Sequence, residues 1–149
     1  MTWGSFFVKT LGMIVVMYLL FFYGYADYVL IDSVVPVEGM EIEEWLAGYK
    51  TAGAASAAVA LLCSAIWFAI GDSYSGGSGI GVKFYGLLLV SVLLGIAVNV
   101  FMVPDSIDGS GLAAVYVVLY PAVVYYLSAL FAYAAPVKYI PAGSESIHK

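Results

Sequence analysis

Four long apolar runs constrain the fold of this chain more than any other feature. They cover residues 6–26, 51–71, 82–103 and 111–135. Each is about 20 residues or longer, the length that a helix needs to cross a hydrocarbon core of about 30 Å. Buried helices of soluble domains are usually shorter and polar on one face. The sequence therefore predicts an all-α integral membrane protein, a single domain folded as a four-transmembrane-helix bundle.

Composition excludes several classes of function. The chain is 64% hydrophobic and only 10% charged, whereas soluble domains are typically about 45–50% apolar. The five basic residues are all lysines and the net charge is −5. Nucleic-acid binding needs a basic patch that neutralises phosphates, so we do not expect it here. Cys63 is the single cysteine, which rules out an intramolecular disulfide.

The lysines indicate how the chain is oriented. Four of the five fall on the side of the two termini, and only Lys50 falls on the other. The positive-inside rule then places both termini and the 72–82 loop in the cytoplasm. The first run is too long for a signal peptide, and no A-x-A cleavage site follows it, so we expect a retained span. Because the composition is similar to that of small four-span bacterial proteins, we expect an inner-membrane protein with an N-in/C-in topology, an outer loop at 32–44 and a cytoplasmic tail at 136–149.

The first span is bulky. Large side chains recur every four residues along it, at Met13, Met17, Phe21 and Tyr25. Residues at this spacing share one helix face, which suits lipid or a broad partner surface. The helix can continue to Ile31. The acidic residues of the outer loop are expected to be solvated, with a site for a divalent cation or a basic partner as the alternative. Residues 40–49 are predicted to form a short amphipathic helix or the start of the second span.

The second span carries small residues at every fourth position. Small side chains let membrane helices approach closely, which is how such helices pack when lipid gives no hydrophobic drive. We therefore predict that this span is the central helix, buried against its neighbours, although the stripe would also suit contacts between subunits. The small-residue stripe consists of Gly48, Ala52, Ser56, Ala60 and Ser64.

The third span has a small, polar face formed by Ser91, Gly95 and Asn99, again at a spacing of four. We expect this face to meet the second span. Asn99 is the most polar residue within any span. Intramembrane polar side chains usually face protein or a cavity. We interpret Asn99 as an interhelical hydrogen-bonding residue, with pore lining as the alternative.

Pro121 lies near the centre of the fourth span. Proline has no backbone N–H, so it frees the carbonyl of Val117 and favours a kink. Tyr116 and Tyr120 share a face just before it. Tyrosine hydroxyls at this depth need hydrogen-bond partners, which predicts protein contact on that side. The kink either serves packing alone or helps the tyrosines to line a small cavity.

The sequence contains no pattern that predicts catalysis. No acid, histidine or lysine lies deep in a span, and one histidine and one cysteine cannot make a metal-ligand cluster. We therefore expect no enzyme activity, no cofactor and no metal. The leading hypothesis is a subunit that stabilises a larger membrane complex of secretion, conjugation, respiratory or photosynthetic type, with lipid and other membrane subunits as partners. The alternative is a small homo-oligomeric channel, a transporter or a phage-type lysis protein.

Overall fold

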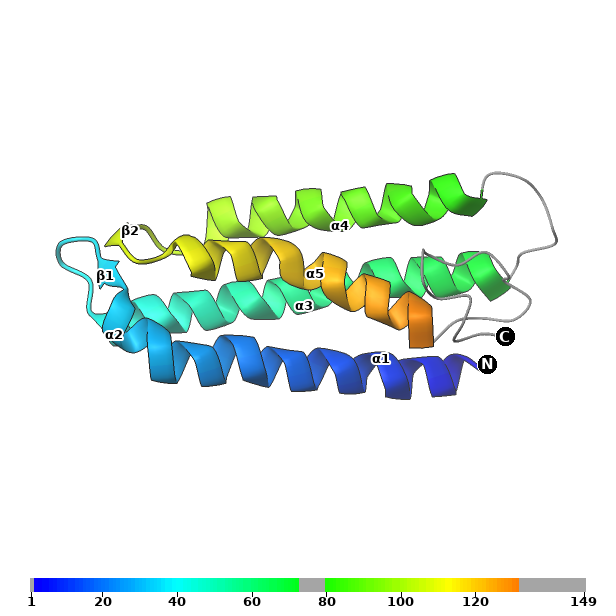
Figure 1. Cartoon of the computed structure of the whole chain (residues 1–149), viewed down its shortest axis with the longest axis horizontal. Coiled ribbons are helices and arrows are strands. Elements are labelled where there is room, and N and C mark those ends of the chain that lie inside the picture. Colours follow the sequence, from blue (N-terminus) through cyan, green and yellow to red (C-terminus); the bar gives the residue numbers. More distant parts are fainter. Residues whose placement is uncertain (1, 73–79, 132–149) are drawn as a thin grey trace.

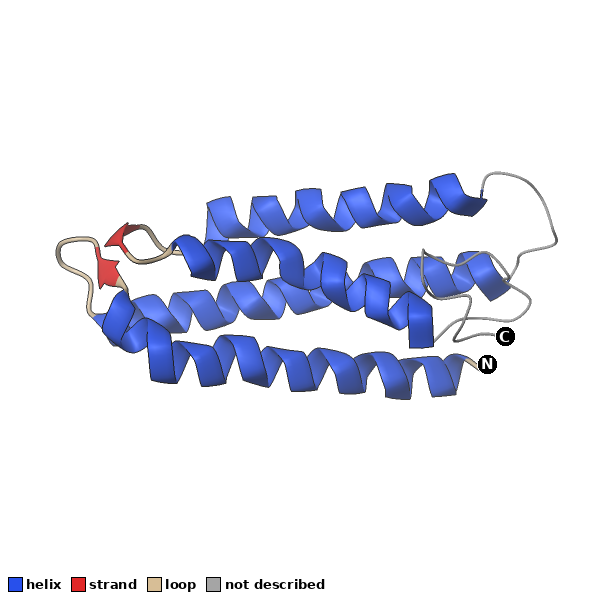
Figure 2. Ribbon diagram, in the orientation of Figure 1, coloured by secondary structure: helices blue, strands red, loops and turns tan. Residues whose placement is uncertain are grey.

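The computed structural model describes residues 2–72 and 80–131. Within these residues, four helices are long and apolar enough to cross a membrane: Trp3–Ser33, Ile42–Gly71, Gly81–Met102 and Gly111–Phe131. The predicted all-α bundle of long apolar helices is therefore confirmed (Figures 1 and 2). The tail at 136–149, residues 132–135 of the fourth span and most of the 72–82 loop lie outside the described residues.

The N-terminal helix is longer and less regular than the sequence indicated. It starts as α1 (Trp3–Tyr18) and continues through two π-helical segments, η1 (Leu19–Gly24) and η2 (Ala26–Leu30), to a last turn, α2 (Ile31–Ser33). A π-helical turn widens the backbone ladder and is commonly found as a local insertion in an α-helix. The helix thus passes the end of the apolar run at residue 26 and continues beyond Ile31, as the sequence allowed, to Ser33.

The second helix, α3 (Ile42–Asp72), begins at Ile42, nine residues before the apolar run at 51–71. Its first turns are amphipathic. Trp45 and Tyr49 are fully buried, whereas Glu43 and Glu44 are exposed in the first turn, where carboxylates favour the helix dipole. Burial of the two aromatic rings thus joins residues 42–49 to the second span, which is one of the two predictions for this segment.

The remaining helices, α4 (Ile80–Met102) and α5 (Gly111–Phe131), begin close to the predicted positions. Two short strands join the loops at one end of the bundle, β1 (Val35–Pro36) and β2 (Ser106–Asp108), which pair antiparallel. We had predicted both segments as unpaired loops. Gly109 follows β2 with a φ of 84°, and a Cβ there would overlap the carbonyl of Ser33, so this connection requires glycine.

The helices are arranged with α3 and α5 in the centre. Figure 1 shows α1 and α4 on opposite sides of this pair. In the most apolar stretch of each helix, the buried share is 39% for α3 and 44% for α5, against 22% for the N-terminal helix and 17% for α4. The prediction that the second span is central is confirmed, but α5 shares that position.

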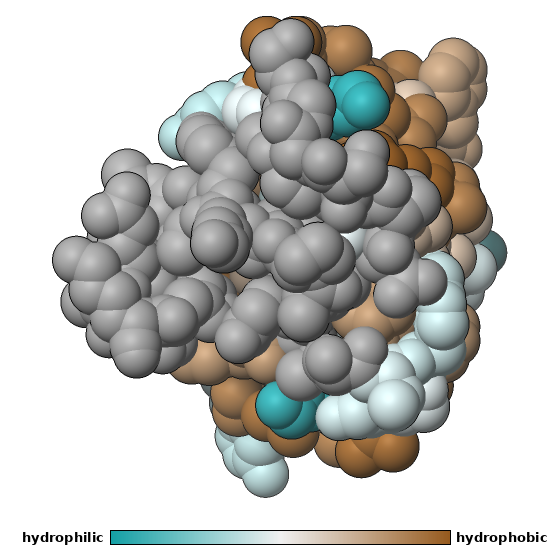
Figure 3. Space-filling view, turned by 90° about the vertical axis from the view of Figure 1, so that its right-hand side faces the viewer, coloured by the Kyte–Doolittle hydropathy of each residue, from teal (hydrophilic) through white to brown (hydrophobic). Residues whose placement is uncertain are grey.

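The outward faces of α1 and α4 are apolar. Large side chains such as Val16 and Leu20 on the N-terminal helix, and Leu89, Leu93 and Val100 on α4, are more than half exposed. Seen from the end of the bundle where α1 begins, most of the described surface is also hydrophobic (Figure 3). Such a surface is compatible with lipid around the bundle.

Candidate functional site

The kink in α5 is connected to the small-residue stripe of α3. Pro121 is buried inside α5 and leaves the carbonyl of Val117 without its usual helical partner. The Ser56 hydroxyl donates a hydrogen bond to this carbonyl oxygen at 3.1 Å, in a buried position. Two features that the sequence predicted separately, the proline kink and the small-residue stripe, thus form one interhelical contact.

Helix α4 reaches the same part of α5 through Gly95. A Cβ at this position would overlap the carbonyl oxygen of Val118, so the two backbones are in direct contact. We had expected the face of Ser91, Gly95 and Asn99 to meet the second span. At Gly95 that expectation was wrong, because α5 shares the centre of the bundle and its backbone is the nearest neighbour.

The N-terminal helix makes a third contact with this region. Tyr120 is buried, and its hydroxyl donates to the carbonyl of Ile14 at 2.7 Å. Residues 117–121 of α5 thus contact α1, α3 and α4. We refer to these residues, together with Ile14, Ser56 and Gly95, as the kink centre.

The other members of the small-residue stripe contact different parts of the chain. Ala52 and Ala60 are buried in the main core. The ring of Pro104 occupies the space that a Cβ at Gly48 would need. Ser64 is buried, and its hydroxyl has no hydrogen-bond partner in the part of the chain that the structure describes. The stripe therefore serves contacts within the chain along most of its length.

The side chains of Ser91 and Asn99 form no hydrogen bond to another helix within the described residues, although such a bond was predicted for Asn99. The Ser91 hydroxyl is bonded to the carbonyl of Leu88, on its own helix, at 2.6 Å. The side-chain oxygen Oδ1 of Asn99 is buried and has no hydrogen-bond partner among residues 2–72 and 80–131. The interhelical hydrogen bond expected of Asn99 is therefore not formed by this oxygen within the described residues.

Further hydroxyl groups connect helices that are distant in sequence. Tyr125 donates to the carbonyl of Phe84 at 2.9 Å, and the Thr10 and Ser128 hydroxyls are 2.8 Å apart in a buried position. The Thr10–Ser128 pair was not predicted from the sequence. Both residues are polar within apolar runs, and this is the signal that would have identified them.

The bulky stripe of the first span contacts α5. The ring of Tyr116 lies 5.0 Å from that of Phe21 and 4.9 Å from that of Tyr25, measured between centroids. The stripe was expected to face lipid or a partner surface, but Phe21 and Tyr25 contact a tyrosine of the same chain. A cavity lined by Tyr116 and Tyr120, one of the two readings of the kink, is present between α1 and α5.

Removing the Ser56 hydroxyl tests the coupling between the stripe and the kink. Ser56→Ala should lower the free energy of unfolding by about 1 kcal/mol, the usual size for a hydrogen bond between membrane helices. In a Pro121→Ala background the cost should be smaller, because the N–H restored at position 121 can bind the Val117 carbonyl. Unfolding in detergent with rising dodecyl sulfate, followed by alkylation of the buried Cys63, measures both values. Equal costs in the two backgrounds would contradict the coupling.

No group of three or more histidine, cysteine or acidic side chains in the described residues is placed to hold a metal ion. Comparisons with known protein families, curated proteins and solved structures find no match. The site is therefore defined by its geometry, a centre of helix packing at the kink of α5.

Proposed function

We propose that this protein is a non-catalytic multi-pass subunit that packs into, and stabilises, a larger membrane complex. Complexes for secretion, conjugation, respiration or photosynthesis are compatible with it. Its partners would be other membrane subunits and the surrounding lipid, in the inner membrane of a bacterium, with both termini in the cytoplasm.

The use of the polar side chains inside the bundle is the observation that carries this proposal. Hydroxyl groups of Ser56, Tyr120 and Tyr125 are bound to backbone carbonyls of neighbouring helices. A transport pathway needs polar groups that face a cavity and exchange partners with the solute. Groups that are already committed to interhelical bonds favour a structural role.

The outward faces support a subunit more than a homo-oligomeric channel. A channel formed by several copies would need polar side chains on a face that lies outside each bundle. On α4 that face carries Leu89, Leu93 and Val100, which are more than half exposed and apolar. Such a face suits a neighbouring apolar helix or lipid.

Two observations support the proposed orientation. The beginning of α1 and the end of α5 lie at one end of the bundle, and the strands lie at the other (Figure 1). Lys50 is the lysine that does not follow the positive-inside rule. It is paired with Asp27 at 2.9 Å and lies over the ring of Tyr23, so its charge is balanced locally and weighs less against this orientation.

The native mass of the protein, solubilised mildly from its host membrane, tests the proposal. Co-migration with several other proteins is the expected result. Asn99→Leu should leave the recovery of those proteins unchanged and should not lower the stability of the isolated chain, since the buried Oδ1 has no partner to lose. Migration as a homo-oligomer that conducts ions in liposomes, with conductance lost in Asn99→Leu, would instead favour the channel.

A further inference from the structure

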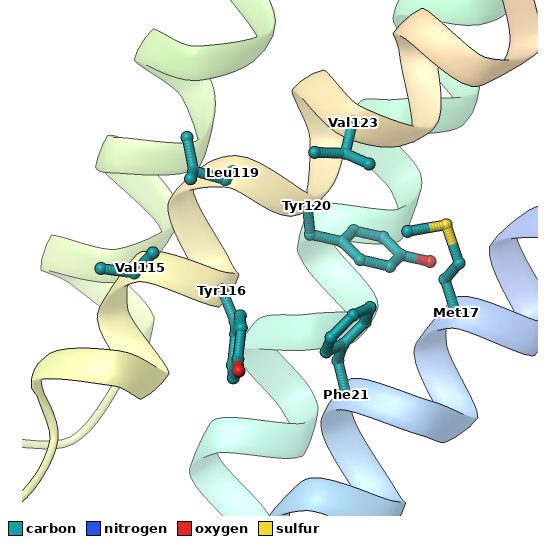
Figure 4. A pocket seen from close by; sticks show the side chains of 7 residues that line it. All are labelled: Met17, Phe21, Val115, Tyr116, Leu119, Tyr120 and Val123. Atoms are coloured by element: carbon teal, nitrogen blue, oxygen red, sulfur yellow. The ribbon is translucent and has the colours of Figure 1, made fainter.

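A groove runs between α1 and α5 on the outside of the bundle. It has a volume of about 200 Å³ and is lined by Met17 and Phe21 of the N-terminal helix and by Leu119, Tyr120 and Val123 of α5. The ring of Tyr120 points toward Met17 and Phe21 (Figure 4). The hydroxyl of Tyr120 is bonded to the carbonyl of Ile14, so the ring contributes an apolar surface. The groove therefore offers hydrocarbon contacts to a ligand.

The groove opens to the surroundings of the bundle. Val115, Leu119 and Val123 follow one another at a spacing of four on α5, and their side chains are 41–44% exposed. An apolar wall that is half open, on a helix long enough to span a membrane, is accessible to lipid chains from the side.

A second hollow lies further along the same pair of helices. It has a volume of about 480 Å³ and is lined by Lys9, Met13 and Phe131. Lys9 and Met13 continue the spacing of four that leads to Met17 and Phe21, and Phe131 lies two such steps beyond Val123. The two hollows are thus in line. On α1 they extend over about 18 Å from Lys9 to Phe21, at 1.5 Å per residue.

Lys9 places a cation at one end of this line. Its side chain is exposed, and Nζ lies 3.4 Å from the carbonyl oxygen of Phe131. An ammonium group has three donors, so this contact leaves two for another acceptor. A lysine about one turn inside a span can extend its charge to the headgroup layer, where lipid phosphates lie.

We propose that the α1–α5 groove binds one anionic phospholipid, with an acyl chain along the apolar wall and the phosphate at Lys9. The positive charge at one end and the apolar wall beyond it match the two parts of this ligand. A partner helix fits less well, because close helix packing in membranes needs small residues. The groove is lined by methionine, leucine and aromatic side chains, which a flexible chain can follow.

Lipid retention by the purified full-length chain tests the proposal. Native mass spectrometry in mild detergent would compare added phosphatidylglycerol and phosphatidylcholine with identical acyl chains. The wild-type chain should prefer phosphatidylglycerol by about fivefold, the size expected for one lysine beside anionic lipid. Lys9→Gln should abolish the preference. Competition by inorganic phosphate alone would show an anion site without a lipid and would overturn the proposal.

A second pair of variants tests the apolar wall. Val123→Trp should fill the groove and weaken retention of both lipids, because the acyl chain loses its van der Waals contacts with the wall. Leu93→Trp, on the outward face of α4, is the matched control and should change nothing. If Val123→Trp does not keep Cys63 protected from alkylation, Leu119→Trp replaces it. Equal retention in the groove variant and the control variant would show that lipid binds without specificity, and this would overturn the proposal. A photo-crosslink in the host membrane from position 123 to another protein would show that a partner helix occupies the groove, and this would overturn it as well.

Discussion

Replacing Gly95 with leucine is expected to lower the free energy of unfolding by about 3 kcal/mol, at the upper end of the usual cost of overpacking. The reason is geometric. A Cβ at position 95 would overlap the backbone of Val118, and a backbone cannot move aside as the end of a flexible side chain can. The added side chain should therefore force α4 away from α5 at the kink centre.

The matched control lies on the same helix. Gly86 is exposed, and a Cβ added there would meet no described atom within 4 Å. Gly86→Leu should therefore leave stability nearly unchanged, or raise it slightly, since glycine is a poor helix former. Alkylation of Cys63 with rising dodecyl sulfate reports both variants, because this thiol is buried where α3, α4 and α5 pack. Equal shifts for the two leucine variants would refute the close contact.

The positions of the helices could be predicted from the sequence, because a transmembrane span is a local property. An apolar run of about 20 residues has few other stable outcomes, and the small residues of α3 indicated a central helix before any neighbour was known. Helix ends are different. The start of α3 at Ile42 depends on burial of Trp45 and Tyr49, and the pairing of β1 with β2 depends on two loops that meet only after the bundle has formed.

The kink centre could be predicted only in part, for a related reason. A proline at position 121 has no backbone N–H, so the sequence alone predicts that the carbonyl of Val117 lacks its helical partner. Its partner, Ser56, was not, because residue spacing does not say which helix lies opposite. The same limit explains why Gly95 was assigned to the wrong neighbour and why Tyr120 was expected to find a partner that could not be named.

The end of the bundle with the strands has a contact of its own, which joins α3 to the end of α4. The Trp45 indole N–H donates to the carbonyl of Pro104 at 2.9 Å, and its ring stacks on Tyr49 with 5.7 Å between centroids. One turn further along α3, Gly48 lies against the ring of Pro104. Because α4 has few buried residues of its own, this contact should contribute much of what holds its end in place.

Trp45→Ala should therefore lower the free energy of unfolding by about 3–5 kcal/mol, the range for removing a fully buried aromatic side chain. Trp45→Phe keeps a ring and loses the hydrogen bond, so it should cost about 1 kcal/mol for that bond. Phe101→Ala is the control, since Phe101 is near the same end of α4 but 84% exposed, and its removal should cost less than about 0.5 kcal/mol. Unfolding by dodecyl sulfate gives the ranking, and hydrogen exchange over residues 100–108 shows whether the loss is local. A Trp45→Ala chain as stable as Phe101→Ala would mean that the α3–α4 contact contributes little, and that the strands hold this end of the bundle together.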